Sequence, residues 1–200
     1  TQADPAYTGK VTVPVLWDKQ TQQIVNNESS DIMRMLNSEF NAFTDHDFDY
    51  YPAALQDKID QINDFVYERI NNGVYRCGFA TTQEAYDEAF GQLFAALDEI
   101  DHTLSQQAYL IGEQITEADW RMFTTLIRFD SVYYGHFKCN QRLIKDYPNL
   151  SGYLKRLYQV PQIAETVNFD YIKAHYYASH GHINPTGIIP QGPCMDWLLG

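Results

Sequence analysis

Glu28 and Ser29 are the first residues in the chain whose position suggests chemistry. They follow the apolar pair Ile24–Val25 and precede a segment with helical periodicity, so we expect them at a helix N-terminus. Free N–H groups and the helix dipole at such an end favour a bound carboxylate. An ordinary helix cap explains the same residues and is the commoner arrangement. The pair therefore predicts either a cap or one half of a binding site.

Pro14 lies within the apolar run at 11–17, which we expect to be a strand. Proline cannot donate to a sheet ladder, so this strand is either an edge strand or carries a special bond. A cis Val13–Pro14 bond would turn backbone amides towards a ligand. The polar residues 18–23 predict a turn before the second apolar run.

Tyrosine is unusually abundant, with 15 Tyr beside 11 Phe. Buried phenols need hydrogen-bond partners, so we expect some of them to line a cleft. A phenol can stack on an aromatic ring and donate to its oxygen. Tyr75 lies just past a predicted helix, where a core tyrosine would be awkward, and Tyr176 and Tyr177 lie on a late helix. Most tyrosines are packing residues, so abundance alone does not select any of them.

Composition excludes several classes of protein. A net charge of −12 and few Lys and Arg argue against nucleic-acid binding. No apolar stretch approaches the roughly 20 residues that span a bilayer. Cys77, Cys139 and Cys194 lack metal-ligand or disulfide spacing, which is typical of a reduced cytoplasmic protein, and Cys77 and Cys139 are expected in the core. His180 and His182 have ligand spacing without a supporting cluster, so we predict a solvated pair and no metal.

Helical periodicity dominates the chain after Ser29. The predicted helices are 31–40, 55–70 with an end near Gly73, 83–104, a buried central helix opened by a Thr116–Asp119 capping box, and two short helices opened by Pro148 and Pro161. Residues 43–52 have no helical period and predict a linker. The tail from Asn184 is expected to be irregular. These elements predict a small α/β unit followed by an all-helical domain, an α+β fold.

Several motifs together resemble one family. They are Val-Pro-Val-Leu-Trp-Asp at 13–18, Asn-Glu-Ser-Ser-Asp-Ile at 27–32, the run at 71–80, Thr-Glu-Ala-Asp at 116–119, His-Phe-Lys-Cys-Asn at 136–140, and residues 165–170 with 175–177. This set resembles the Xi-class glutathione transferases, the glutathionyl-hydroquinone reductases. The resemblance implies a βαβ remnant in residues 1–43, as the C-terminal part of a thioredoxin-like glutathione-binding domain. Residues 44–200 then form the all-helical C-terminal domain.

The resemblance also implies roles for individual residues. Val13 and Pro14 would meet the glutathione backbone, while Glu28 and Ser29 would hold its γ-glutamyl end. Tyr75 and Tyr176 would be the catalytic tyrosines facing the hydroquinone, with Tyr177 in the same substrate pocket and an alternative to Tyr176. The family's nucleophilic cysteine lies in a Cys-Pro-Trp-Ala segment that residues 1–200 do not contain. We therefore expect a native protein that is longer at its N-terminus.

The implied activity is thiol-dependent reduction of glutathionyl-hydroquinones, with glutathione as co-substrate and no metal. The implied partners are a small aromatic substrate, glutathione and a second copy of the chain in a homodimer, with no nucleic acid and no membrane. Two other functions are consistent with the residues. One is a conjugating glutathione transferase, which forms thioethers. The other is a truncated, non-catalytic binding protein.

Overall fold

The computed structural model describes residues 2–45 and 48–199, and the chain divides after Ala53 into two compact units. We call residues 1–53 the N-terminal unit and residues 54–200 the helical unit. The boundary predicted from the sequence lies after residue 43, within the N-terminal unit. Residues 46–47 of the predicted linker, and residues 1 and 200 of the predicted domains, lie outside the described part of the chain.

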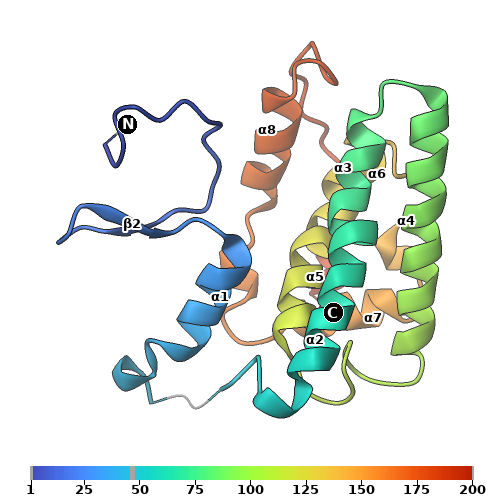
Figure 1. Cartoon of the computed structure of the whole chain (residues 1–200). Helices are drawn as coiled ribbons and strands as arrows, with labels where there is room; N and C mark the ends of the chain where they lie inside the picture. The colour runs from blue at the N-terminus through green and yellow to red at the C-terminus, as the bar shows by residue number, and fades with distance from the viewer. Residues whose placement is uncertain (1, 46–47, 200) are drawn as a thin grey trace. The chain divides into compact units, whose positions relative to one another are not determined.

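Helices make up most of the described chain (Figure 1). The strands are β1 (Leu16–Asp18) and β2 (Gln23–Asn26), and the α-helices are α1 (Ser29–Ser38), α2 (Gln56–Val66), α3 (Asn72–Phe79), α4 (Gln83–Leu104), α5 (Glu117–Arg128), α6 (Tyr134–His136), α7 (Leu150–Tyr158) and α8 (Phe169–Ser179). Two π-helical segments, η3 (Tyr67–Asn71) and η4 (Phe129–Tyr133), connect α2 to α3 and α5 to α6. Short 3₁₀ turns occupy Asn41–Phe43, Ala53–Leu55, Ile144–Asp146, Ala164–Thr166 and Asp196–Leu198.

The N-terminal unit contains an antiparallel hairpin, in which Trp17 pairs with Ile24. The predicted βαβ remnant is therefore wrong in detail, because the two strands are joined directly by a tight turn. The carboxylate of Asp18 stabilises that turn by accepting from the N–H of Gln20 at 2.7 Å and the hydroxyl of Thr21 at 2.7 Å. These bonds lower the pKa of Asp18.

Pro14 precedes the hairpin. The predicted strand was too long, because β1 begins only at Leu16. The Val13–Pro14 bond is cis, which is one of the two arrangements that a proline in this run predicted. Proline at a strand entrance removes no ladder hydrogen bond, and this explains why pairing starts after it.

Helix α1 follows β2 directly and is capped by Glu28, whose side chain accepts from the N–H of Ser30. The predicted apolar face is only partly buried. Ile32 is buried, whereas Leu36 is 58% exposed and Phe40 is 45% exposed. A two-stranded hairpin is too small to cover a ten-residue helix.

In the helical unit, α2, η3 and α3 form one continuous helical run. The predicted end near Gly73 is wrong, because tertiary packing overrides the low helix propensity of Asn and Gly there. Helix α3 packs against α4, and a Cβ on Gly73 would make an ordinary van der Waals contact with Leu93 at 3.4 Å. The amide of Asn71 donates to the hydroxyl of Thr125 on α5.

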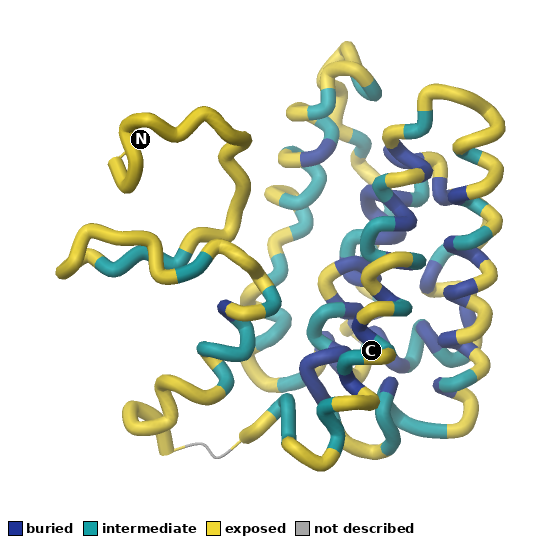
Figure 2. Tube along the Cα trace, in the orientation of Figure 1, coloured by how far each residue is buried: buried dark blue, intermediate teal, exposed yellow. Residues whose placement is uncertain are grey.

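Helices α4 and α5 carry the core of this unit, and Figure 2 shows buried positions following the helices. The predicted stripe on α4 is confirmed by the burial of Ala89, Leu93, Ala96, Leu97, Ile100 and Leu104. The predicted capping box is also confirmed, because the carboxylate of Asp119 accepts from the N–H of Thr116 at 2.7 Å. Eight of the twelve residues of α5 are buried, as a central helix requires.

The last third of the chain departs from the prediction at Pro161. Helix α7 does follow Pro148, but Pro161 is followed by turns, and α8 begins only after Asn168, whose side chain accepts from the N–H of Tyr171. The tail from Asn184 is irregular, as predicted, and Leu198 within it is buried. Among the described residues, no helix has the length and apolarity needed to cross a membrane.

Substitution of Gly78 tests how closely α3 packs against Phe137. A Cβ at this position would overlap the ring of Phe137, whereas a Cβ on Gly91 of α4 would meet nothing within 4 Å. We expect Gly78→Ala to lower the free energy of unfolding in urea by about 2 kcal/mol, because overpacking forces the ring aside. The matched control, Gly91→Ala, should raise it by about 0.5 kcal/mol. Equal effects of the two substitutions would contradict this account.

Candidate functional site

Three tyrosine hydroxyls meet inside the helical unit. The hydroxyl of Tyr176 lies 2.7 Å from that of Tyr75 and 2.9 Å from that of Tyr133. Tyr176 and Tyr133 are buried, and Tyr75 is half-buried. We call these three residues the tyrosine cluster. Its polar centre, surrounded by aromatic rings, can bind a ligand that carries oxygen on an apolar body.

The cluster draws one residue from each of three helical segments. Tyr75 lies inside α3, so the expectation that it lies past a helix end was wrong. Tyr133 ends the π-helical segment η4, and Tyr176 lies on α8, which packs against η4. The π-helical segment η3 precedes the helix of Tyr75, and η4 contains Tyr133. Such segments often occur at functional sites.

Aromatic side chains form the walls of the cluster. Phe137 stacks on Tyr133 with ring centroids 5.4 Å apart, and its ring lies 5.3 Å from that of Tyr75. Phe79 contacts both Tyr75 and Phe137. Gly78 supplies the space that Phe137 occupies. Phenol rings held on several sides in this way present their hydroxyls in fixed directions.

The hydroxyls of Tyr133 and Tyr176 remain protonated at neutral pH, because the pKa of each is raised. Burial raises the pKa of Tyr133, and the neighbouring Tyr176 and Tyr75 act in the same direction. Burial also raises the pKa of Tyr176 to about 12, while the hydrogen bond with Tyr133 opposes this change. Protonated phenols are hydrogen-bond donors, so the cluster suits an acceptor oxygen.

Tyr177 takes a different position from its neighbour Tyr176. Its ring packs on His136 at a centroid distance of 4.5 Å, and burial raises its pKa. Consecutive residues on a helix point about 100° apart, so Tyr176 and Tyr177 cannot both face the cluster in the same way. Of the two tyrosines that the sequence left open, Tyr176 is the one hydrogen-bonded to Tyr75.

Sequence reasoning missed Tyr133 and the pair formed by His136 and His180. His136 Nε2 lies 3.1 Å from His180 Nδ1, and His180 also stacks on Phe137. The prediction of a solvated His180–His182 pair is therefore wrong for His180, which is half-buried, although His182 is exposed. Tyr133 lies two residues before Gly135 in an apolar helical stretch, and such a stretch does not distinguish a core tyrosine from a functional one.

The four residues expected to bind glutathione lie in the N-terminal unit. Val13 is 88% exposed beside the cis bond to Pro14, so its main chain is open to a ligand. Glu28 caps α1, and its Oε1 also lies 3.4 Å from the hydroxyl of Ser29. Ser29 is the first residue of α1. The N-terminus of α1 thus provides both a carboxylate and free N–H groups.

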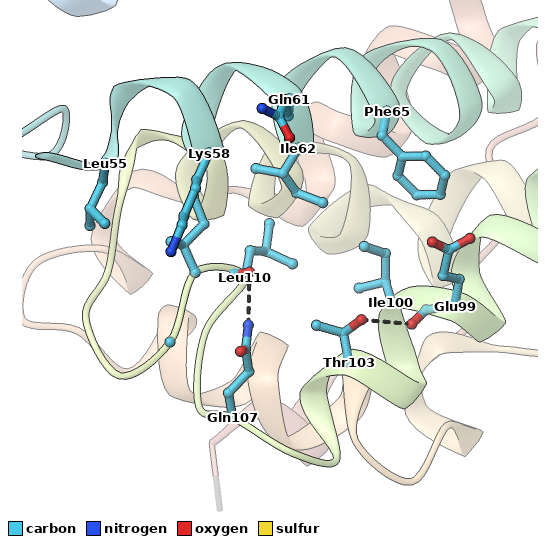
Figure 3. Close-up of a pocket in the computed structure, with 12 residues that line it drawn as sticks. Leu55, Lys58, Gln61, Ile62, Phe65, Glu99, Ile100, Thr103, Gln107 and Leu110 are labelled. Carbon is cyan, nitrogen blue, oxygen red and sulfur yellow. Dashed lines mark hydrogen bonds between the residues drawn. The ribbon is translucent and has the colours of Figure 1, made fainter.

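Two other features of the helical unit do not belong to the cluster. A cavity of about 570 Å³ is lined by α2, α4 and the link at 107–112, including Ile62, Phe65 and Ile100, and no predicted site residue lines it (Figure 3). Across residues 2–45 and 48–199, no group of three or more His, Cys, Asp or Glu side chains is arranged to hold a metal ion. Cys77 and Cys139 are buried, as predicted.

Comparison with known proteins gives the family. Residues 2–39 match the glutathione S-transferase N-terminal domain, and residues 83–156 match its C-terminal domain. The glutathionyl-hydroquinone reductase YqjG of Escherichia coli is 57% identical over 194 residues, which are 97% of this chain and 59% of that protein. Its glutathione-bound structure superposes with a TM-score of 0.95, covering 98% of this chain and 63% of that one.

Glutathione transferase Xi 1 from Trametes versicolor is 50% identical, with a TM-score of 0.93 and coverage of 97% of this chain and 68% of that one. The chain belongs to the glutathione transferase family and, within it, to the Xi class. It spans 59% and 62% of the length of the first two curated relatives that it matches.

His136 makes stability depend on pH. Burial lowers its pKa from 6.5 to about 4, with His180 and Lys138 acting in the same direction. Because the unfolded chain takes up this proton at a higher pH than the folded chain does, His136 destabilises the fold as pH falls from about 6.5 towards 4. We expect the stability advantage of the unaltered chain over His136→Gln to be about 1 kcal/mol smaller at pH 5 than at pH 7, measured by urea unfolding.

This comparison cancels the contribution of Asp130, which both chains contain. Burial raises the pKa of Asp130 to about 6, so its ionisation acts on stability in the opposite sense over part of the same range. A difference between the two chains that does not change with pH would show that His136 is not held neutral by the fold.

Proposed function

We propose that the protein carrying this sequence is a glutathionyl-hydroquinone reductase with glutathione as co-substrate. The observation that carries the proposal is the tyrosine cluster, in which the hydroxyls of three phenols meet among aromatic rings. A hydroquinone has the matching shape, an aromatic ring bearing oxygen acceptors. Two relatives that are 57% and 56% identical are named glutathionyl-hydroquinone reductases.

In this proposal a thiolate attacks the sulfur that joins glutathione to the ring. The carbon–sulfur bond breaks, a disulfide with glutathione forms, and the bonding electron pair passes to the ring and its oxygens. The hydrogen-bonded hydroxyls of Tyr75 and Tyr176 donate one hydrogen bond to the ring oxygen on which this charge develops, and the ring carbon then takes a proton. A second glutathione resolves the mixed disulfide and leaves as glutathione disulfide.

Burial argues against Cys77 and Cys139 as the attacking thiol, because a nucleophilic cysteine needs access to its substrate. Cys194 is exposed in the irregular tail and is not part of the tyrosine cluster. The proposal therefore assigns the thiolate to a residue outside these 200. Free thiols also support a cytoplasmic location, and we propose a homodimer as the working form.

Glu28 and Ser29 hold the γ-glutamyl end of glutathione in this proposal. Ser29 offers its hydroxyl and backbone N–H to the glutamyl carboxylate at the positive end of α1. The carboxylate of Glu28 pairs with the glutamyl ammonium. Main-chain groups of Val13, beside Pro14, meet the cysteinyl part.

The activity test uses the native protein with a glutathionyl-hydroquinone and glutathione. We expect Tyr75→Phe or Tyr176→Phe to lower turnover by about 100-fold, because each removes a hydroxyl of the pair that presents the donor to the oxygen that gains charge. Hydroquinone and glutathione disulfide are measured by chromatography. Tyr171→Phe is the matched control, since Tyr171 lies on the same helix as Tyr176 and is 76% exposed.

The outcome also separates the alternative functions. Thioether formation on electrophiles without reduction would identify a conjugating transferase. Glutathione binding without either reaction would identify a binding protein. Equal activity of the unaltered protein, Tyr75→Phe and Tyr176→Phe would leave the cluster without the role proposed here.

The proposed binding of the glutamyl ammonium by Glu28 predicts a separate loss of glutathione affinity. We expect Glu28→Gln to weaken glutathione binding by about tenfold, because a charge-assisted bond to the ammonium is replaced by a neutral one. Isothermal titration calorimetry measures this affinity. Glu39→Gln is the control, since Glu39 lies at the other end of α1 and is exposed. Identical affinities for the two variants would place the γ-glutamyl group elsewhere.

A further inference from the structure

Tyr133 is the innermost member of the tyrosine cluster and has no assigned role in the proposed reaction. Its side chain is 2% exposed, and its ring lies edge-on to Tyr176 at 5.5 Å and stacks on Phe137. Its hydroxyl lies 2.9 Å from that of Tyr176. Tyr75, whose ring lies 5.9 Å from that of Tyr133, is half-buried and is the more accessible end of the cluster.

A count of the hydroxyl hydrogens shows which tyrosine of the cluster donates and which accepts. Three hydroxyls carry three hydrogens, and two contacts between them use two. A buried O–H left without an acceptor is costly, and among the described residues the acceptor within hydrogen-bond distance of the Tyr133 hydroxyl is the oxygen of Tyr176. Tyr133 therefore donates, and Tyr176 accepts. One hydrogen is then left at the accessible end, on Tyr75 or on Tyr176, free to point at a ligand.

We propose that Tyr133 is a positioning residue, which by donating to Tyr176 directs the remaining hydroxyl hydrogen of the cluster towards the ligand oxygen. The inference rests on the function proposed above and refines it. Tyr133 does not touch the ligand. It prevents Tyr176 from turning its own hydrogen inward, so that the accessible end of the cluster always presents a donor.

The direction of these hydrogen bonds determines which protonation state of a phenolic ligand binds best. A site that presents an O–H donor favours an acceptor oxygen and, above all, a phenolate, since charge-assisted hydrogen bonds are the stronger ones. Bonds in a chain also polarise one another, so the donation from Tyr133 makes the last O–H a stronger donor. The cluster thus selects the anionic form of a phenolic ring over its neutral form.

A purely structural role for Tyr133 makes a different prediction. Its ring contacts with Phe137 and Phe129 persist in phenylalanine, so Tyr133→Phe removes the hydroxyl and keeps the packing. Tyr153→Phe is the matched control. Tyr153 is also fully buried, and its hydroxyl donates to Asp119 at 2.9 Å, outside the cluster. Both variants lose one buried hydrogen bond, but Tyr153→Phe leaves the tyrosine cluster intact whereas Tyr133→Phe changes it.

The probe is 4-nitrophenol, whose absorbance reports whether the bound molecule is ionised. For each protein, titration gives the affinity for 4-nitrophenolate and the pH at which the bound probe ionises. We expect Tyr133→Phe to weaken phenolate binding about fivefold and to raise the ionisation pH of the bound probe. Tyr153→Phe should change both by less than about twofold. The same losses in both variants, or an unchanged ionisation pH in Tyr133→Phe, would overturn the inference.

Two further measurements distinguish a failure of the proposed function from a failure of the Tyr133 inference alone. If Tyr75→Phe and Tyr176→Phe bind 4-nitrophenolate as the unaltered protein does, the cluster is not the ligand site, and the proposed function fails with the inference. In the unaltered protein, the hydroxyl proton of Tyr133 should exchange slowly with water and show a nuclear Overhauser contact to the Tyr176 ring. A slowly exchanging proton on Tyr176 directed at Tyr133 would reverse the direction and overturn the inference alone.

Discussion

The buried carboxylate of Asp119 is the interaction on which the helical unit depends. It accepts from the N–H of Leu110 at 2.9 Å, from the N–H and hydroxyl of Thr116, and from the hydroxyl of Tyr153. Burial raises its pKa, and these hydrogen bonds oppose that change. One side chain thereby joins the link before α5, the start of α5 and the middle of α7. Removing this acceptor would leave several buried donors without a partner, which is costly.

The tyrosine cluster follows from the way α5 is anchored. Helix α5 begins at the Asp119 box and continues into η4, whose last residue is Tyr133. A second buried carboxylate holds that segment, because Asp130 accepts from the backbone N–H of Ile144 at 2.6 Å and of Lys145 at 3.2 Å. Buried acidic groups thus fix both ends of the helical run that carries Tyr133. The same device recurs at Asp101, which accepts from the backbone N–H of Asn149 and Leu150 at the start of α7.

The proposed chemistry divides between the two compact units. The N-terminal unit offers a capped helix start and an exposed main chain, which suit the charged and peptide-like parts of glutathione. The helical unit offers phenols and aromatic walls, which suit the ring. Each half is built by its own local hydrogen bonds and packing.

Sequence alone determined the features that depend on neighbouring residues. The α4 stripe, the Thr116–Asp119 box and the helix start at Glu28 were all visible, because caps and helical periodicity act over three or four positions. Family motifs added the expectation that Tyr75 and Tyr176 face one substrate, and the structure joins their hydroxyls although they lie 101 residues apart. Tertiary structure alone decided that the helix runs through Gly73, that η3 and η4 are π-helical, and that Tyr133 and His180 join the aromatic site. These outcomes depend on contacts between distant segments, such as the packing of α3 on α4, which overrides the local preferences of the residues involved.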